Sequence, residues 1–358
     1  MTTPWVPKLV VGEFAPPFVV RAPNNPAFNF STVAGRYILL AFLPGPGPQR
    51  EAAFAAYQAH SALFDDHKLA AFFVLTDPHS IAQARNHATG LRWFLDEDQA
   101  VSRLYGAADG DAHWLLLDPF LRVLAQAPLD EAASIFARIS HLPAVADHAG
   151  VTLHAPVLVL ARVFEPDFCR ELIAYYEAKG GLPSGVMREV AGRTVGVLDS
   201  FKSRRDVSIE DSDLRAQVRE RLSRRLIPEL AKVFQFHATR LERYTVACYD
   251  AAEGGYFRAH RDNETPGTAH RRFACSINLN AEEFEGGELC FPEFGPRTYR
   301  APTGGAVVFS CSLQHEAKPV TAGRRYAYLP FFYDEAGAVV RQANLGSLAP
   351  AESDTHPR

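Results

Sequence analysis

Cysteine is scarce in this sequence and absent from its first part. The chain of 358 residues contains five cysteines, and all of them follow residue 168. An odd number of cysteines gathered in one part of the chain does not form a disulfide framework. Reduced thiols are the simpler interpretation, and they predict a cytoplasmic protein.

Long apolar segments and a large excess of one charge are missing as well. The longest apolar run covers residues 37–43, far short of the roughly 20 residues that a membrane-spanning helix needs. Residues 1–8 contain no basic segment followed by an apolar core, so we expect no signal peptide. The formal net charge of −4 gives no general attraction to nucleic acid or to an anionic membrane. We therefore expect neither of these among the partners.

The overall composition is that of a globular protein with room for two domains. Hydrophobic residues make up 47% of the chain and charged residues 22%. A length of 358 residues exceeds what one hydrophobic core usually organises. We predict a first domain over residues 1–147, a second over residues 148–340 and a tail over residues 341–358, with a linker near residues 143–154.

Residues 10–143 alternate between strand-like and helix-like segments. Apolar runs at residues 37–43 and 69–75 predict strands that are buried on both faces. A helix is expected after each run, marked by Phe54, Tyr57 and Phe64 for the first and by Ile81, Ala84 and His87 for the second. Residues 113–118 and 122–126 predict a hairpin. This order predicts a mixed α/β domain.

This part of the chain resembles the thioredoxin-like fold, and in particular the peroxiredoxins. The resemblance rests on residues 11–18 and 94–105. In that family a peroxidatic cysteine begins the helix after the strand at residues 37–43, where the helix dipole lowers its pKa. Here Glu51 takes the place of that cysteine and Pro48 that of the family's threonine. The resemblance thus implies the fold without peroxide chemistry or dithiol exchange. It leaves an accessory role in docking, dimerisation or substrate presentation, or a scaffold role.

The second part of the chain begins with helices. Pro166 near a first turn and Gly180 near an end predict a helix over residues 166–178. Residues 211–234 predict one long helix with charges of both signs. Residues 183–206 have little periodicity and predict a long loop that covers a site.

Short β-rich runs follow, separated by glycine, proline and acidic residues. These runs cover residues 243–249, 273–279, 288–291, 306–310 and 326–333. Such spacing predicts an antiparallel double-sheet barrel, the double-stranded β-helix or jelly roll. The fold class that we predict is α/β for the first domain and mainly β, with flanking helices, for the second.

A candidate metal site lies within this β-rich region. His260 and Asp262 are two residues apart, and His315 follows at a distance. Two histidines and one carboxylate form the ligand face that holds Fe(II) and leaves coordination positions open. A surface histidine beside a solvated aspartate is the alternative for each part of this pattern. Facing strands of the barrel would bring the three side chains together.

The sequence around these residues resembles the 2-oxoglutarate- and Fe(II)-dependent oxygenases of the prolyl 4-hydroxylase-like class. The resemblance covers residues 155–335 and rests on four ordered motifs, at residues 249–262, 273–280, 284–289 and 315–326. It implies His260, Asp262 and His315 as iron ligands. It also implies Fe(II), 2-oxoglutarate and O2 as cofactors, with ascorbate as an accessory reductant. The implied reaction hydroxylates an acceptor while 2-oxoglutarate is converted to succinate.

The resemblance assigns two further residues. Arg325, ten residues after His315, would receive the distal carboxylate of 2-oxoglutarate. Side chains alternate across a strand, so Arg324 should then face outward. Tyr249 would add a hydrogen bond to 2-oxoglutarate, and an ordinary core tyrosine is the open alternative. We interpret His270, which matches none of these roles, as a surface histidine.

The sequence leaves the acceptor open. It is either a side chain of a peptide or protein or a free small molecule, and a homodimer is a further open alternative. A second class of function is a non-catalytic iron- and 2-oxoglutarate-binding sensor or adaptor that docks partners through the first domain. The complete set of His260, Asp262, His315 and Arg325 favours the enzyme, because a lapsed enzyme would more often have lost one of them.

Overall fold

The computed structural model describes residues 8–85, 89–108, 111–190 and 192–348. Residues 1–7, His87 and the last ten residues of the predicted tail lie outside these ranges. The chain divides into two compact units: unit 1 is Met1–His154 with Pro292–Pro296, and unit 2 is Ala155–Phe291 with Arg297–Arg358.

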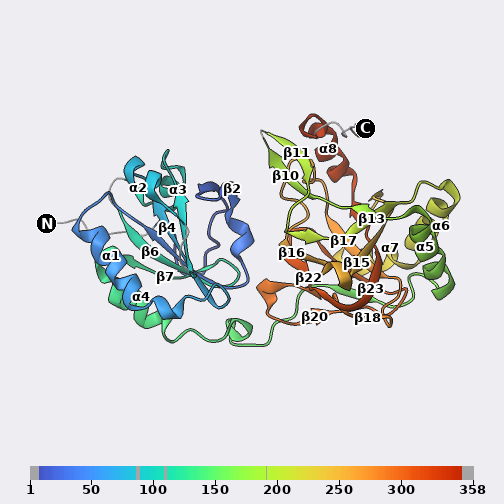
Figure 1. Ribbon diagram of the computed structural model, residues 1–358, viewed down its shortest axis with the longest axis horizontal. Helices are drawn as coiled ribbons and strands as arrows, with labels where there is room; N and C mark the ends of the chain where they lie inside the picture. The colour runs from blue at the N-terminus through green and yellow to red at the C-terminus, as the bar shows by residue number, and fades with distance from the viewer. Residues whose placement is uncertain (1–7, 86–88, 109–110, 191, 349–358) are drawn as a thin grey trace. The chain divides into compact units, whose positions relative to one another are not determined.

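A seven-stranded sheet forms the centre of unit 1 (Figure 1). Its strands are β1 (Val19–Ala22), β2 (Asn25–Asn29), β3 (Tyr37–Phe42), β4 (Leu69–Leu75), β5 (Leu91–Leu95), β6 (His113–Leu117) and β7 (Val123–Pro128). They lie in the order β2-β1-β5-β4-β3-β6-β7. The pairs β3–β4 and β4–β5 are parallel, whereas β6 runs antiparallel to both β3 and β7. The predicted strands at residues 37–43 and 69–75 and the hairpin after them are confirmed.

Both faces of this sheet are buried, because apolar residues occupy consecutive positions of β3 and β4. Leu39 of β3 contributes to one hydrophobic core and Leu40 to the other. The helices are α1 (Pro48–Ala59), α2 (Pro78–Gln83), α3 (Ala100–Tyr105) and α4 (Ala132–Ile139). Helices α1 and α4 lie on one side of the sheet (Figure 1) and α3 on the other. The first two helices are shorter than predicted, since Phe64 and Ala84 lie beyond their ends.

Helices cover one face of the larger sheet of unit 2. They are α5 (Pro166–Lys179), α6 (Ser212–Arg225) and α7 (Ile227–Phe234), and α8 (Glu335–Ala343) follows the last strand. The single helix predicted over residues 211–234 is wrong: it is divided at Leu226. Pro228 has no N–H to donate and its ring clashes with the preceding turn, so the helix restarts there. Helix α8 continues past residue 341, where we placed the start of the tail.

Antiparallel strands build the rest of unit 2. They are β8 (Leu158–Leu160), β9 (Leu182–Pro183), β10 (Val186–Val190), β11 (Arg193–Val197), β12 (Lys202–Ser203), β13 (Arg205–Ser208), β14 (Arg240–Glu242), β15 (Thr245–Asp250), β16 (Tyr256–His260), β17 (Phe273–Asn278), β18 (Phe284–Gly286), β19 (Leu289–Cys290), β20 (Thr298–Tyr299), β21 (Ala306–Ser310), β22 (His315–Ala317), β23 (Val320–Tyr328) and β24 (Phe331–Tyr333). The larger sheet contains ten strands, with β14-β24-β17-β23-β15-β13-β9 as its main path. The smaller has five, in the order β12-β16-β22-β19-β20. The prediction of a β-rich second domain is confirmed.

Two details of this region differ from the prediction. The long loop expected over residues 183–206 contains the hairpin of β10 and β11 and the strands β12 and β13. These strands are short and carry charged residues and glycine, so cross-strand hydrogen bonds rather than apolar alternation define them. The strand expected over residues 326–333 is interrupted at Pro330, because proline cannot donate to the sheet.

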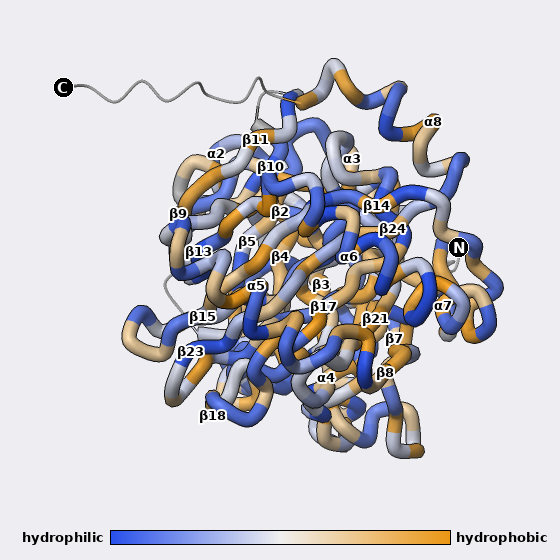
Figure 2. Tube along the Cα trace, turned by 90° about the vertical axis from the view of Figure 1, so that its right-hand side faces the viewer, coloured by the Kyte–Doolittle hydropathy of each residue, from blue (hydrophilic) through white to orange (hydrophobic). Residues whose placement is uncertain are grey.

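The central strands of both units are more hydrophobic than the helix α6. Figure 2 shows β3, β4 and β21 mainly in the hydrophobic colours and α6 mainly in the hydrophilic ones. Within the described residues, no helix combines the length and the apolar character needed to cross a bilayer. The five cysteines are free and buried, and all belong to unit 2.

Candidate metal centre

Two histidines face each other at the ends of adjacent strands in the smaller sheet. His260 is the last residue of β16 and His315 the first of β22. The antiparallel register pairs them directly, and their ring centroids are 4.3 Å apart. Residues that are 55 positions apart in the sequence are thus brought together by strand pairing.

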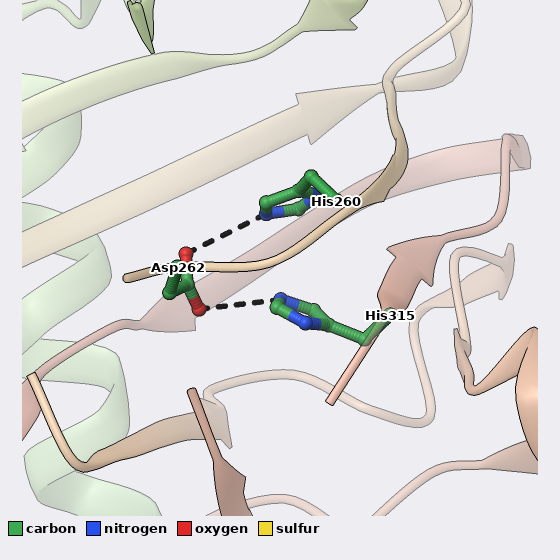
Figure 3. A group of neighbouring side chains, drawn as sticks. All are labelled: His260, Asp262 and His315. Atoms are coloured by element: carbon green, nitrogen blue, oxygen red, sulfur yellow. Dashed lines mark ion pairs between the residues drawn. The ribbon is translucent and has the colours of Figure 1, made fainter. Parts of the chain in front are cut away.

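Asp262 completes the group from the segment that follows β16. Its backbone N–H donates to the carbonyl of Cys311 at 3.0 Å, which fixes the turn. Its carboxylate oxygens lie 3.5 Å from Nε2 of His260 and 3.3 Å from Nε2 of His315 (Figure 3). The three potential ligand atoms all lie within 4.8 Å of one another, and no other group of this kind occurs in the part of the chain that the structure describes.

The second nitrogen of each histidine ring is already engaged. Nδ1 of His260 lies 2.7 Å from the carbonyl oxygen of Arg258, and Nδ1 of His315 lies 3.0 Å from that of Leu313. A carbonyl only accepts, so both Nδ1 atoms carry a proton, and both Nε2 atoms face Asp262. Such backbone bonds orient histidine ligands in metal sites and fix their tautomer.

Burial and mutual charge set the protonation states of the centre. Burial alone raises the pKa of Asp262, but the neighbouring His315 and His260 hold it well below its ordinary value. Burial, and next the charge of His260, lower the pKa of His315 to about 4. The centre therefore offers a carboxylate together with a neutral imidazole, the forms that bind a divalent metal.

Aromatic rings form the walls around the histidines. The Phe257 ring stacks on His260 with centroids 3.5 Å apart, and Phe309 packs against His315 at 4.5 Å. Nζ of Lys202 lies 5.0 Å from the centroid of Phe257. These contacts hold the imidazoles and keep water from that side of the centre.

Arg325 points from β23 into the larger sheet's inner face and is only 3% exposed. Nη2 donates to Oγ of Ser276 at 2.8 Å, and Nε donates to Oδ1 of Asn278 at 3.3 Å. Nη1 is buried without a hydrogen-bond partner in the described structure. An unpaired buried guanidinium nitrogen is costly, so this position fits an anionic ligand.

The neighbouring Arg324 points the other way. Its side chain is 56% exposed, and its Nε donates to Asp250 at 2.8 Å. The predicted alternation of the two arginines along the strand is therefore confirmed. Gly287 leaves room for the inward-pointing Arg325, because a Cβ at position 287 would lie 3.1 Å from Cδ of Arg325 and 2.8 Å from Cγ2 of Val320. The φ of Gly287, +71°, also disfavours any other residue.

Tyr249 lies beside Arg325, as its partner in the β15–β23 register. The Arg325 guanidinium is 5.1 Å from the Tyr249 ring centroid. The hydroxyl of Tyr249 accepts a hydrogen bond of 3.3 Å from Nη1 of Arg204, which the sequence reasoning missed. Arg204 also donates two hydrogen bonds to the carboxylate of Asp206, at 2.7 and 2.6 Å. Arg204 and Asp206 come from residues 183–206, which we interpreted as a loop. The side-chain alternation of the strand around Tyr249 therefore could not predict that they lie beside it.

His270 is not a surface histidine, and this part of the sequence interpretation is wrong. It is only 2% exposed, and its Nε2 lies 2.6 Å from Oε2 of Glu242. Arg271 also binds Glu242, with Nη2 2.7 Å from Oε1, and its Nη1 lies 3.4 Å from the carbonyl oxygen of Asp262. His270 is thus part of a buried ion network whose Arg271 reaches the metal centre.

No protein-family model matches the chain. Among curated proteins, a PKHD-type hydroxylase from Verminephrobacter eiseniae is 32% identical over 117 residues, which cover 30% of this chain and 47% of the relative. A PKHD-type hydroxylase from Nitrobacter winogradskyi is 29% identical over 209 residues, covering 54% of this chain and 83% of the relative. The chain thus spans about half the length of the first relative and most of the second.

A solved structure is also similar in part. The viral collagen prolyl hydroxylase from Paramecium Bursaria Chlorella virus-1, in its 2OG complex, superposes with a TM-score of 0.38 at 16% sequence identity. The superposition covers 49% of this chain and 94% of the viral protein. A TM-score at this level does not establish a shared fold. The similarity that the comparisons show is therefore one of sequence segments, to PKHD-type hydroxylases.

Proposed function

We propose that unit 2 is an Fe(II)- and 2-oxoglutarate-dependent dioxygenase of the prolyl 4-hydroxylase-like class. In the proposed reaction an acceptor is hydroxylated while 2-oxoglutarate is decarboxylated to succinate. The observation that carries the proposal is the convergence of His260, Asp262 and His315. The similarity to PKHD-type hydroxylases supports the same class.

The donor set fits Fe(II). Two imidazole nitrogens and one carboxylate on one side of a metal leave positions open on the other. Bound there, the metal would supply the oxidising chemistry with O2. The protein's own part is to hold the ligands through the carbonyls of Arg258 and Leu313 and to exclude water with Phe257 and Phe309.

Arg325 fits a carboxylate ligand. Its Nη1 is buried and without a partner among the described residues, whereas Ser276 and Asn278 fix its other nitrogens. A carboxylate would complete the guanidinium by a charge-assisted hydrogen bond. We assign Arg325 to the distal carboxylate of 2-oxoglutarate and Tyr249 to a neighbouring contact with it.

The remaining assignments are parts of the same proposal. We infer that unit 1 is a thioredoxin-like domain without the catalytic cysteine, supported by its β4-β3-β6-β7 order with β6 and β7 antiparallel. Glu51 lies in the first turn of α1, where that cysteine would stand. Its proposed role is accessory, in docking, dimerisation or presentation of a peptide or small-molecule acceptor to unit 2. The proposed location is the cytoplasm, with ascorbate as an accessory reductant.

Succinate formation tests the proposed function. The full chain is incubated with Fe(II), 2-oxoglutarate and O2, and succinate is measured with and without a protein-containing cell extract. Mass spectrometry of the extract then identifies the species that gains one oxygen atom. We expect succinate that depends on both Fe(II) and O2, and more of it when the extract is present.

The same measurement separates the enzyme from a non-catalytic sensor. A sensor would bind Fe(II) and 2-oxoglutarate and produce no succinate above the rate of free iron in buffer. His315→Ala serves as the matched protein blank for iron-dependent background. Succinate formation by His315→Ala at the wild-type rate would contradict the proposed site.

A further inference from the structure

Unit 2 contains a hollow of about 580 Å³. This volume is within the range of sites that bind small molecules or short side-chain segments, about 300–1,000 Å³. Its walls come from β9, the hairpin of β10 and β11, β13, α6 and the start of β15. Its charged lining residues are Asp206, Arg215 and Arg243.

The one acidic lining residue is already neutralised. Asp206 is held by Arg204 through Nε and Nη2, at 2.7 and 2.6 Å. It also accepts a hydrogen bond from Ser184 at 2.5 Å. The charges left over in the hollow are therefore those of Arg215 and Arg243, and the hollow is electropositive.

Neither arginine has a carboxylate partner within the described ranges. Nε of Arg215 donates to the carbonyl oxygen of Ile209, and its guanidinium lies 5.2 Å from the Tyr244 ring. The Arg243 guanidinium contacts the Phe331 ring at 5.3 Å. Burial, and next the charge of Arg271, lower the pKa of Arg243 to about 10, so it stays charged at neutral pH. A partly buried cation without an anion is unfavourable, which is the condition that a bound anion relieves.

The hollow adjoins the metal centre through three successive contacts. Lys202 donates through Nζ to Oγ of Ser184 at 2.6 Å and to the carbonyl of Gly185 at 2.9 Å, and both residues line the hollow. Lys202 in turn lies over Phe257, which stacks on His260. Only two side chains therefore separate the wall of the hollow from a metal ligand.

Strand β15 also connects the hollow with the surroundings of Arg325. Val246 and Cys248 pack into the core beneath the helices, whereas Ala247 and Tyr249 face the opposite way. Thr245, which lines the hollow, shares that face by alternation. Thr245 and Tyr249 are four residues apart, which corresponds to about 13 Å along a strand. The hollow and the Tyr249–Arg325 pair therefore lie on one face of β15, at a distance that a small molecule can span.

We infer that this hollow binds the acceptor of the proposed hydroxylation through a carboxylate that pairs with Arg243. This inference rests on the proposed function and adds the substrate class: an acidic peptide or a free amino acid, each of which carries that group. The planar guanidinium receives a carboxylate by paired hydrogen bonds, with Arg215 adding positive charge from α6. The ion-paired Asp206 stands in the same hollow, so a singly charged carboxylate fits better there than a doubly charged phosphate.

Matched probes on the unmodified full chain test the inference. The chain is loaded with Fe(II) and saturated with 2-oxoglutarate under nitrogen, so that Arg325 is occupied and no turnover occurs. Titration calorimetry then compares pairs that differ by one group. The peptide arm uses proline-containing hexapeptides with Glu or Gln beside the proline; the small-molecule arm uses L-proline and L-prolinamide. A third pair has phosphoserine or serine beside the proline.

We expect the acidic member of the peptide or the amino-acid pair to bind at least about tenfold more tightly than its amide, as charge-assisted bonds usually give. Arg243→Gln should bring this ratio close to one, and Arg243→Lys should leave part of it. Arg224→Gln is the control, because Arg224 is an exposed arginine of α6 whose loss changes the net charge equally.

Three results would overturn the inference. The first is that the acid and the amide bind equally, or do not bind, in both arms. The second is that Arg243→Gln leaves the ratio of acid to amide affinity unchanged. The third is that the phosphoserine peptide binds more tightly than the Glu peptide. If a variant fails to fold, the comparison of acid and amide ligands on the unmodified chain still tests the inference. Failure of the proposed function has a different signature, the absence of succinate in aerobic turnover whatever the binding ratios.

Discussion

His260 and His315 are direct partners in the register of β16 and β22, with their Nε2 atoms on either side of the Asp262 carboxylate. A strand pair fixes the distance between two residues more tightly than a loop does, because backbone hydrogen bonds hold both neighbours in place. The metal centre is therefore prepared by the sheet, with only Asp262 placed by a turn.

Removal of any metal ligand should weaken Fe(II) binding by more than about 100-fold. His260→Ala, Asp262→Ala and His315→Ala each remove a ligand atom, and even loss of a residue that merely orients a ligand costs about 10–100-fold in metal affinity. We expect losses above this range, measured by equilibrium dialysis against Fe(II) under nitrogen. His237→Ala, at an exposed histidine, is the control. Full iron occupancy in one of the three variants would exclude that residue as a ligand.

The two adjacent arginines should differ in their effect on 2-oxoglutarate binding. Arg325→Ala removes the buried guanidinium, and we expect a roughly ten- to several-hundred-fold loss, from charge-assisted bonds of about 1.5–3 kcal/mol each. Arg324→Ala breaks an exposed ion pair with Asp250 and should change binding little. The measurement is titration of the Fe(II)-loaded chain under nitrogen. Equal losses in both variants would contradict the assignment.

His270 should be important for stability rather than silent. His270→Ala removes a buried side chain and its hydrogen bond to Glu242, which should lower the free energy of unfolding of unit 2 by about 1–3 kcal/mol. Denaturant unfolding measures this change. His237→Ala, at an exposed histidine of unit 2, is the matched control. A His270 variant as stable as the control would mean that Arg271 alone satisfies Glu242.

Glu242 should make stability depend on pH. Burial alone raises the pKa of Glu242, but the hydrogen bond from His270 and the charge of Arg271 hold it well below its ordinary value of 4.5. A lowered native pKa stabilises the fold at pH values above 4.5, and this contribution declines as pH falls below 4.5, when the unfolded chain takes up the proton first.

The matching variant is Glu242→Gln. Its deficit in unfolding free energy relative to the wild type should be full at pH 7 and smaller at pH 3.5. Urea titrations of both proteins at the two pH values provide the measurement. A deficit that grows on acidification would show that the sign of the linkage is wrong.

The native thiols should be unreactive. Burial raises the pKa of Cys169 to about 12 and those of Cys248 and Cys290 to about 11, so little thiolate exists at neutral pH. We expect slow labelling by a disulfide reagent until denaturant is added, and no peroxide consumption above the buffer rate in the presence of a thiol reductant. Rapid peroxide turnover by the native chain would contradict this.

Several features followed from the sequence by itself. The apolar runs of β3 and β4 required burial on both faces, and the alternation of side chains on one strand required Arg324 and Arg325 to point in opposite directions. The candidate ligands His260, Asp262 and His315 could be named from residue type and motif order. These are local properties, because the period of a strand and the chemistry of a side chain do not depend on distant partners.

Other features were decided by tertiary structure alone. His270 became a core residue because Glu242, 28 positions earlier, packs against it, and a histidine has no local signal for burial. The hollow around Arg243 exists because the β10–β11 hairpin, α6 and β13 meet there, although the hairpin segment carries no apolar alternation. Cross-strand pairing is a non-local interaction, so the chain's own pattern specifies which residues can pair, and only the folded sheet decides which of them do.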